Sequence, residues 1–351
     1  MPAGGDHATV TSPAPPGAEL GRRLSTGDLS AAPAALNVLE STTPHDRRQA
    51  AALLRALSPR ALGREAPGHI VGVTGPPGAG KSTLLSRLLA AWRARGRTVA
   101  MLAVDPASRR SGGSLLGDRA RVDFDPADGG VFIRSTSAGD QLGGLAPATR
   151  TAAQVLASAF DVVVIETVGV GQAETDVADV ADTVAVIVQP GSGDVLQFLK
   201  SGIMEIPEVL VVTKADLGRV ADRARRDLSA ALRSLGSRDT PIVSVSSVPP
   251  VRGVDELIDA LDGHRARVDL SDRRTHARRA GALAEFTREH GQSGLRRLGG
   301  RRGAGRWLAE QATGLEGPAL LDALEKRSGV PRSTAAQVIA PRAPAAPERQ
   351  R

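Results

Sequence analysis

The sequence predicts an α/β fold, in which a mostly parallel, doubly wound sheet carries helical N- and C-terminal extensions. Short runs of Val and Ile alternate along the chain with stretches whose apolar residues recur at helical spacing. The runs are continuously apolar, which is typical of strands buried on both faces of a parallel sheet. The first run, residues 69–75, leads through a glycine-rich loop into an amphipathic helix at residues 81–96. Such strand–helix alternation indicates a sheet covered by helices.

In chain order, the elements divide into five parts. Residues 1–33 are rich in Pro, Gly, Ala and Ser, so we expect a disordered tail. Residues 34–65 carry Ala51, Leu54 and Leu57 at helical spacing, which predicts one or two N-terminal helices. Residues 66–265 form the α/β body. Residues 266–340 are predicted to be a C-terminal helical region, and residues 341–351 a second disordered tail.

The α/β body shows clear strand and helix signals. Its central helix, residues 81–96, has a continuous apolar face, and Gly96 is the stop signal. We predict the strands at residues 69–75, 98–105, 130–135, 161–167, 183–190, 208–216 and 240–247.

Composition excludes several kinds of chemistry. The 351 residues include no cysteine, so disulfides, thiolate-bound zinc and thiol catalysis are ruled out. Aromatic residues make up 2% of the chain, too few for base stacking on aromatic platforms. The net charge of +7 comes from scattered arginines without a binding motif, so we expect no nucleic-acid partner. No apolar run approaches the roughly 20 residues of a membrane span and no secretory signal is visible, so we expect a cytoplasmic protein without a membrane partner.

A phosphate-binding motif lies between the first predicted strand and its helix. It matches G-x-x-x-x-G-K-[ST] in full, and its residues are Gly75, Pro76, Pro77, Gly78, Ala79, Gly80, Lys81 and Ser82, followed by Thr83. Glycines let the backbone curl so that N–H groups point inward, and the helix N-terminus adds a favourable dipole. Lys81 brings positive charge to the β- and γ-phosphates, and the Ser82 hydroxyl suits Mg²⁺. We predict that the chain binds and hydrolyses a nucleoside triphosphate.

A second motif points to guanine as the base. Thr213, Lys214 and Asp216 end a buried strand at the place where GTPases commonly carry N-K-x-D. The Asp216 carboxylate can accept hydrogen bonds from guanine N1–H and the exocyclic amine, and the Lys214 stem can pack along the base. Thr213 stands in place of Asn, and its hydroxyl can still donate or accept a hydrogen bond. Ser246 and Ser247 fall where GTPases place a loop against the base, and we include them as candidates.

Acidic residues at strand ends suggest a Mg²⁺ site and a switch. Asp105 follows a buried strand, and Asp118 lies at the end of a Gly/Ser-rich run, as in loops that order around Mg²⁺ and the γ-phosphate. Glu166 ends another strand whose end should lie beside the phosphate loop. There its carboxylate can contact either the Mg²⁺ shell or the attacking water. Gly169 and Gly171, with Gln172 after them, would let the next segment respond to the γ-phosphate.

Together these motifs resemble the MeaB/ArgK family of P-loop GTPases, the methylmalonyl-CoA mutase-associated G proteins. The matching runs are GPPGAGKSTL, AVDPASRRSGGSLLGDRARV, VIETVGVGQAETDVADVADT, VQPGSGDVLQFLKSGIMEI and VVTKADL, within residues 66–265. The resemblance implies a sheet of the SIMIBI type and a GTP/GDP-binding, Mg²⁺-dependent hydrolase. It also implies that Asp105 and Asp118 fall at the family's Mg²⁺-site acids and Glu166 at its catalytic or metal-linked glutamate.

The resemblance further implies a partner and an assembly. Proteins of this family act as chaperones that gate adenosylcobalamin delivery to an acyl-CoA mutase, and protect or reactivate it. Residues 189–200, with Asp194 and Lys200 as charged members, match a third switch loop that signals to the mutase. The family uses its C-terminal region for homodimerisation. The chain departs from the pattern at Thr213, in the loop SSVPPVRG and in most of the C-terminal helices.

Three other functions remain open from the sequence. The first is an ArgK-like kinase or transport ATPase that phosphorylates a transport protein or a small molecule. The second is a metal-insertion GTPase for nickel, which would need Cys/His ligands, whereas this chain has no Cys and six scattered His. The third is a nucleotide-dependent scaffold without enzymatic activity.

Overall fold

The computed structural model describes residues 16–41, 43–105, 122–137, 145–167, 173–191, 207–237 and 239–331. Among these residues lies a parallel sheet of seven strands in the order β3-β2-β4-β1-β5-β6-β7. The strands are β1 (His69–Thr74), β2 (Val99–Asp105), β3 (Val131–Ser137), β4 (Val162–Thr167), β5 (Thr183–Val188), β6 (Val209–Val212) and β7 (Ile242–Ser244). The predicted parallel α/β sheet and the positions of its strands are confirmed.

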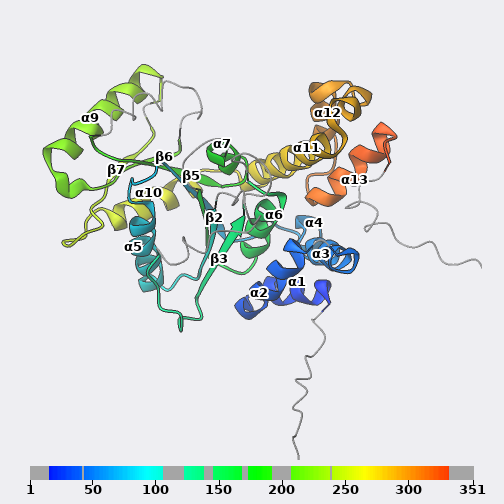
Figure 1. Cartoon of the computed structure of the whole chain (residues 1–351), viewed down its shortest axis with the longest axis horizontal. Coiled ribbons are helices and arrows are strands. Elements are labelled where there is room, and N and C mark those ends of the chain that lie inside the picture. Colours follow the sequence, from blue (N-terminus) through cyan, green and yellow to red (C-terminus); the bar gives the residue numbers. More distant parts are fainter. Residues whose placement is uncertain are drawn as a thin grey trace, which may run out of the picture.

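Helices cover both faces of the sheet (Figure 1). On one face, α5 (Lys81–Ala94) and α10 (Val254–Arg265) pack against the strands with Leu and Val side chains and Trp92. On the other face lie α6 (Pro147–Leu156), α7 (Ala173–Ala178) and α9 (Arg219–Ser234), which begins after the 3₁₀ turn η3 (Ala215–Leu217). Four strands (β1, β4, β5 and β6) are buried at every residue, which explains their continuous Val/Ile runs.

A second helical layer begins near the N-terminus. It consists of α1 (Gly17–Ser25), η1 (Leu29–Ala31), α2 (Ala32–Glu40), α3 (Pro44–Ala56) and α4 (Pro59–Leu62). This corrects the predicted disordered tail of residues 1–33 from Gly17 onward, because the chain is helical there and both Leu20 and Leu24 are fully buried. Residues 1–15 lie outside the described residues. A Cβ at position 17 would stand 2.0 Å from the Gln49 carbonyl oxygen, so glycine lets α1 approach α3 closely. The glycine that suggested disorder is therefore a packing residue.

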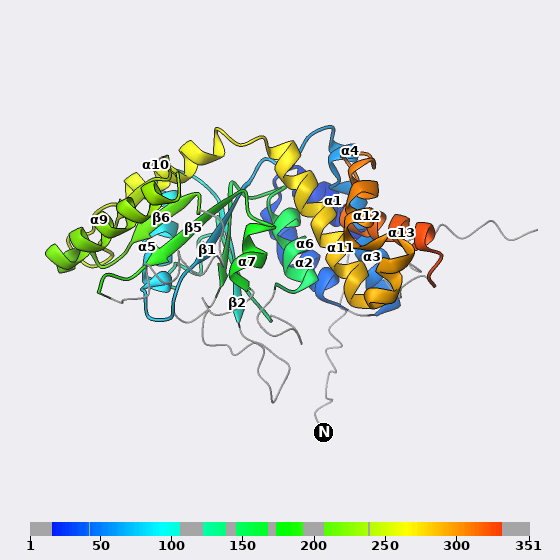
Figure 2. The same ribbon diagram turned by 90° about the horizontal axis from the view of Figure 1, so that it is seen from above.

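The C-terminal helices are α11 (Leu270–Arg297), α12 (Gly300–Ala309) and α13 (Gly317–Ser328). The helical path of α11 breaks at Gly291, whose φ of 58° and ψ of −162° are not helical. These helices have an apolar core of their own, which includes Phe286, Leu308 and Leu324. Figure 2 shows them beside α1–α4, at the end of the molecule away from α9. The expected tail at 341–351 lies outside the described residues.

Within the described ranges, no helix combines the length and the apolar character that crossing a bilayer requires.

Candidate nucleotide-binding site

The phosphate-binding loop leaves the centre of the sheet at the end of β1 and enters α5. Gly75 has a φ of 150°, and a Cβ there would lie 2.3 Å from the Ile187 carbonyl oxygen of neighbouring β5. Gly80 has a φ of 87° and caps α5, a left-handed backbone that glycine adopts without strain. The local sequence thus produces a curled loop at a helix N-terminus, an arrangement that binds phosphate.

Lys81 folds back over this loop. Its side chain is buried, and Nζ donates to the carbonyl oxygens of Gly75 at 2.7 Å and Pro76 at 3.1 Å. A buried ammonium group needs such acceptors, because its desolvation is costly. The loop therefore holds a positive charge at its centre, where oxygens of a triphosphate can take over the contacts.

Ser82 and Glu166 meet across two elements. The Ser82 hydroxyl donates to Glu166 Oε1 at 3.3 Å, and the glutamate is only 6% exposed. Glu166 reaches this position because β4 lies between β1 and β2, where it pairs with Val73 and Ala103. One residue further, the hydroxyls of Thr74 and Thr167 join the ends of β1 and β4 at 2.9 Å. Sequence reasoning missed this threonine pair.

A hydroxyl and a buried carboxylate at a helix N-terminus fit Mg²⁺, which prefers hard oxygen ligands. Asp105 is the last residue of β2, and its neighbour Val104 pairs with Thr167, so its backbone lies at the same edge of the sheet. The structure does not describe the Asp105 side chain. Asp118 lies outside the described residues, as do Gly169, Gly171, Gln172, Asp194 and Lys200.

The predicted base-binding residues follow β6 and β7. Lys214 has a φ of 52°, and its Nζ donates to the Gly78 carbonyl oxygen at 3.0 Å. Asp216 is exposed, and its Oδ1 accepts from the Ser246 hydroxyl at 3.3 Å. Thr213 is 2% exposed and lies under the phosphate loop, where its hydroxyl donates to the Ala79 carbonyl oxygen at 2.7 Å. The structure thus brings the phosphate motif and the second motif together at one edge of the sheet.

A further residue supports this end of the site. Arg87 of α5 donates through Nε to the Ser247 carbonyl oxygen at 2.9 Å. The adjoining loop is closed by Ser246 and Arg252, whose backbones exchange two hydrogen bonds. Arg87 lies six residues after Lys81 on a helix, but its partner is 160 residues away, so the sequence held no signal for this contact.

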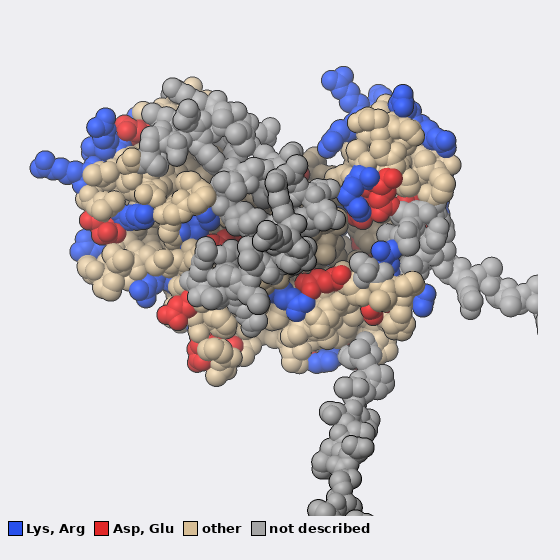
Figure 3. Space-filling view, in the orientation of Figure 1, with Lys and Arg blue, Asp and Glu red and all other residues tan. Residues whose placement is uncertain are grey.

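A large cavity among the described residues lies elsewhere. It measures about 440 Å³ and opens between α6, α7 and the C-terminal helices. Its lining includes charged groups of both signs, namely Arg150, Asp176, Asp179, Glu285, Arg288 and Arg301. Burial raises the pKa values of Asp179 and Glu285. In the orientation of Figure 1, Figure 3 shows that Lys and Arg gather at the two ends of the visible face, over α9 and over the C-terminal helices. The cavity shares no lining residue with the phosphate loop, and we do not assign it to the nucleotide.

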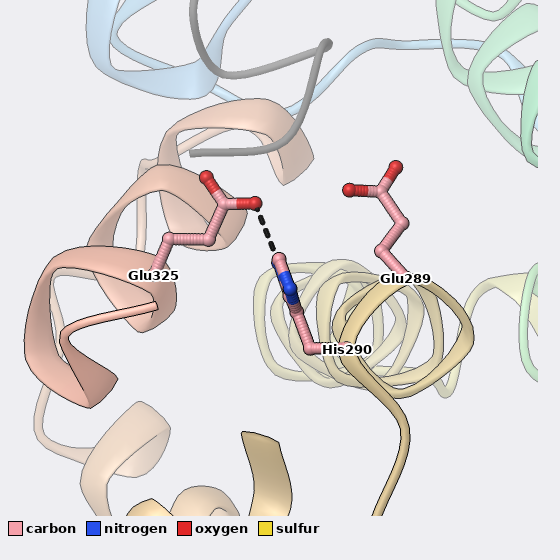
Figure 4. Close-up of side chains that lie close together, drawn as sticks. All are labelled: Glu289, His290 and Glu325. Atoms are coloured by element: carbon pink, nitrogen blue, oxygen red, sulfur yellow. Dashed lines mark hydrogen bonds and ion pairs between the residues drawn. The ribbon is translucent and has the colours of Figure 1, made fainter. Parts of the chain in front are cut away.

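A group of potential metal ligands joins α11 to α13 (Figure 4). The ligand atoms of Glu289, His290 and Glu325 lie within 4.8 Å of one another. His290 Nε2 is 2.9 Å from Glu325 Oε1, and Arg288 pairs with Glu289 at 3.3 Å. Both acids thus already have cationic or imidazole partners, and we interpret the group as a hydrogen-bonded contact between two helices.

Comparison with known proteins decides which P-loop family this is. The family model described as "Methylmalonyl Co-A mutase-associated GTPase MeaB" matches residues 32–296. The chain belongs to the MeaB family. A probable GTPase of Mycobacterium bovis is 42% identical over 246 residues, which are 68% of this chain and 72% of the relative. A putative GTPase of Pyrococcus abyssi is 40% identical over 269 residues, 74% of this chain and 80% of the relative.

Two further similar proteins extend the comparison. The mitochondrial methylmalonic aciduria type A homologue of Caenorhabditis elegans is 35% identical over 266 residues, covering 72% of this chain and 67% of the relative. A crystal structure described as LAO/AO transport system kinase superposes with a TM-score of 0.60 at 27% identity, covering 88% of this chain and 96% of the other. The predicted family and the predicted P-loop GTPase fold are confirmed, and the chain is a GTPase.

Proposed function

We propose that this MeaB-family protein is a GTP-hydrolysing chaperone for an adenosylcobalamin-dependent acyl-CoA mutase of the methylmalonyl-CoA mutase type. It gates delivery of the cofactor to the mutase and protects or reactivates that enzyme. Membership of a family described as mutase-associated supports this proposal, as does the relative named for methylmalonic aciduria type A.

In this proposal the residues of the phosphate loop bind GTP. Backbone N–H groups of residues 78–83 surround the phosphates, and Lys81 exchanges its loop carbonyls for β- and γ-phosphate oxygens. Ser82, Asp105, Asp118 and Glu166 would hold Mg²⁺, which supplies charge neutralisation at the transferred phosphoryl group. Glu166 either holds the metal's water shell or orients the attacking water.

The segment after Glu166 would transmit the nucleotide state. Gly169, Gly171 and Gln172 are proposed to rearrange around the γ-phosphate, and Asp194 and Lys200 to signal to the mutase. Such loops order on GTP and loosen after hydrolysis in other GTPases. We propose that α11–α13 serve homodimerisation, because they extend from the body around a core of their own.

The contact between Ser82 and Glu166 carries the mechanistic part of this proposal, and Glu166→Gln tests it. We expect GTP turnover to fall about 100-fold or more, since positioning of a proton-accepting group contributes that much. The affinity for a non-hydrolysable GTP analogue should change little. Asp216→Asn is the matched control, because it should alter base preference while leaving the phosphate end intact. Wild-type turnover rates in the Glu166→Gln variant would remove the glutamate from the mechanism.

The chaperone role needs its own experiment. A purified methylmalonyl-CoA mutase should co-elute with the protein, change its GTP turnover and lose activity more slowly in its presence with GTP. The Glu166→Gln variant should bind the mutase, but because it hydrolyses GTP slowly it should not release the mutase from its protected state. A mutase that neither co-elutes nor affects turnover would exclude this client.

The solved relative described as a transport system kinase gives one reason to test phosphoryl transfer as well. Labelled γ-phosphate should appear as free phosphate in this protein. Its transfer to a protein or small-molecule acceptor would favour the kinase alternative.

A further inference from the structure

Thr213 stands between the phosphate loop and the base-binding residues. It follows β6, and its backbone N–H donates to the Val188 carbonyl oxygen at 3.0 Å. Its hydroxyl lies 2.7 Å from the Ala79 carbonyl oxygen and 3.2 Å from that of Val188. With 2% of its surface exposed, the side chain is buried beneath the loop.

The number of hydrogens that the Thr213 side chain can donate limits its contacts. A threonine hydroxyl has one hydrogen, whereas an asparagine amide has two. The Thr213 hydrogen is directed at Ala79, so none remains for a second acceptor. An asparagine at this place could support the loop with one hydrogen and still present the other to a ligand.

The neighbouring polar groups are also directed elsewhere. Lys214 Nζ donates to the Gly78 carbonyl oxygen, and the Ser246 hydroxyl faces Val248 O and Asp216 Oδ1. The backbone N–H groups of Ala215 and Ser246 donate to the carbonyls of Val245 and Arg252. Among these residues, Asp216 is exposed and Lys214 is half-buried, and the Asp216 carboxylate is an acceptor.

We propose that Thr213 supports the phosphate loop and that its side chain makes no hydrogen bond to purine N7, so that base selection comes from the Asp216 carboxylate. This inference rests on the proposed nucleotide site. A carboxylate selects the edge of guanine that carries N1–H and the 2-amino group, which are donors. The imidazole edge offers N7, an acceptor, which needs a donor that Thr213 cannot supply.

Nucleotides that lack N7 test the inference on the wild-type protein. Calorimetry should give affinities for GDP and 7-deaza-GDP that agree within about 2-fold. In Thr213→Asn, 7-deaza-GDP should bind about 3- to 10-fold more weakly than GDP, the range expected for one neutral hydrogen bond. A wild-type protein that already prefers GDP by about 5-fold or more would overturn the inference.

Thr213→Val tests the supporting role. Valine has the shape of threonine but leaves the Ala79 carbonyl without its donor in the free and the bound protein alike, so the denaturant midpoint should fall. Any loss of affinity should be equal for GDP and 7-deaza-GDP, so their ratio stays at that of the wild type. A selective loss of GDP binding would show instead that the hydroxyl contacts the base.

Asp216→Asn separates failure of this inference from failure of the proposed site. An amide donor at position 216 can pair with the 2-oxo group of xanthine, so the variant should lose GDP affinity and gain XDP affinity. If Asp216→Asn leaves the GDP/XDP ratio unchanged, the proposed base site is wrong. If the ratio switches but the wild type discriminates against 7-deaza-GDP, only the assignment of Thr213 is wrong.

Discussion

Polar groups are buried in different ways at the carboxyl edge of the sheet, where its strands end, and at the amino edge, where they begin. At the carboxyl edge, Lys81, Thr213 and Lys214 donate to backbone carbonyls of the phosphate loop. At the amino edge, Arg274 of α11 makes two hydrogen bonds of 2.6 and 2.8 Å to Asp182, just before β5. Ligand oxygens can replace the acceptors of Lys81, whereas the amino-edge charges neutralise each other. The carboxyl edge is thus the proposed nucleotide site, whereas the amino edge fastens α11 to the sheet.

The fastening extends beyond one ion pair. Arg274 also donates to the carbonyl oxygens of Ala66 and Gly68, each at 2.6 Å, and is 3% exposed. Burial by itself would raise the pKa of Asp182, but the hydrogen bonds and charge of Arg274 outweigh it and hold that pKa below its usual value. Next to this pair, His69 Nε2 and His264 Nδ1 each lie 2.8 Å from the Thr183 hydroxyl. Segments far apart in sequence are thereby held at one place.

The largest expected effect comes from breaking the ion pair between Arg274 and Asp182 at the amino edge. Arg274→Met should lower the free energy of unfolding by roughly 3–5 kcal/mol, because it leaves Asp182 as a buried charge without its partner. Denaturant unfolding measures this change. The double variant Arg274→Met, Asp182→Asn should recover much of the loss while keeping an acceptor for the Ile70 N–H. A loss below about 1 kcal/mol in the single variant would contradict the fastening role.

Lys81→Ala should affect the other edge alone. We expect roughly 10- to 100-fold weaker GTP binding, since charged hydrogen bonds contribute about 1.5–3 kcal/mol. Calorimetry measures the affinity and denaturant unfolding the stability, which should fall less than in Arg274→Met. Lys326→Ala, which removes an exposed partner of Asp322, is the matched lysine control. Unchanged affinity in Lys81→Ala would refute the phosphate-loop assignment.

Acid should destabilise the protein at the amino edge of the sheet. Burial lowers the pKa of His69 to about 4, so the unfolded chain binds a proton at pH values where the folded chain does not. The stability contribution is therefore complete above pH 6.5 and decreases as pH falls from 6.5 towards 4. Between pH 7 and pH 5 we expect a loss of about 2 kcal/mol from His69.

Burial lowers the pKa of His264 as well, so its contribution has the same sign. Unfolding curves at several pH values should show a smaller loss in His69→Gln than in the wild type. Equal slopes for the two proteins would place the acid sensitivity elsewhere.

The smallest expected effect concerns the hydrogen bond between Arg87 and Ser247 at the carboxyl edge. Arg87→Ala removes one exposed hydrogen bond to Ser247, so GTP affinity should fall about 3-fold, with little change in stability. Arg95→Ala, at the C-cap of the same helix, is the matched control, because its partners are the exposed Asp255 and Asp259 of α10. Equal affinities for the two variants would mean that Arg87 does not position the base loop.

Local patterns predicted the sheet and the phosphate loop. Continuous Val/Ile runs located the strands, and the spacing from Gly75 to Ser82 placed the loop before a helix. The same reasoning failed at residues 17–33, where Gly17 and Leu20 look unremarkable until α3 is packed against them. It also could not see that the Thr213 hydroxyl is taken by Ala79, which lies 134 residues earlier in the chain.

The sequence by itself determined that a triphosphate loop follows the first strand of a parallel sheet, because both signals depend on residues close together along the chain. Only the tertiary structure decided that Glu166 reaches Ser82, that Thr213 supports the loop, and that Arg274 fastens α11 to the sheet. Each of these contacts joins residues separated by 84 to 134 positions. Strand order and helix packing, which no local pattern specifies, bring such partners together.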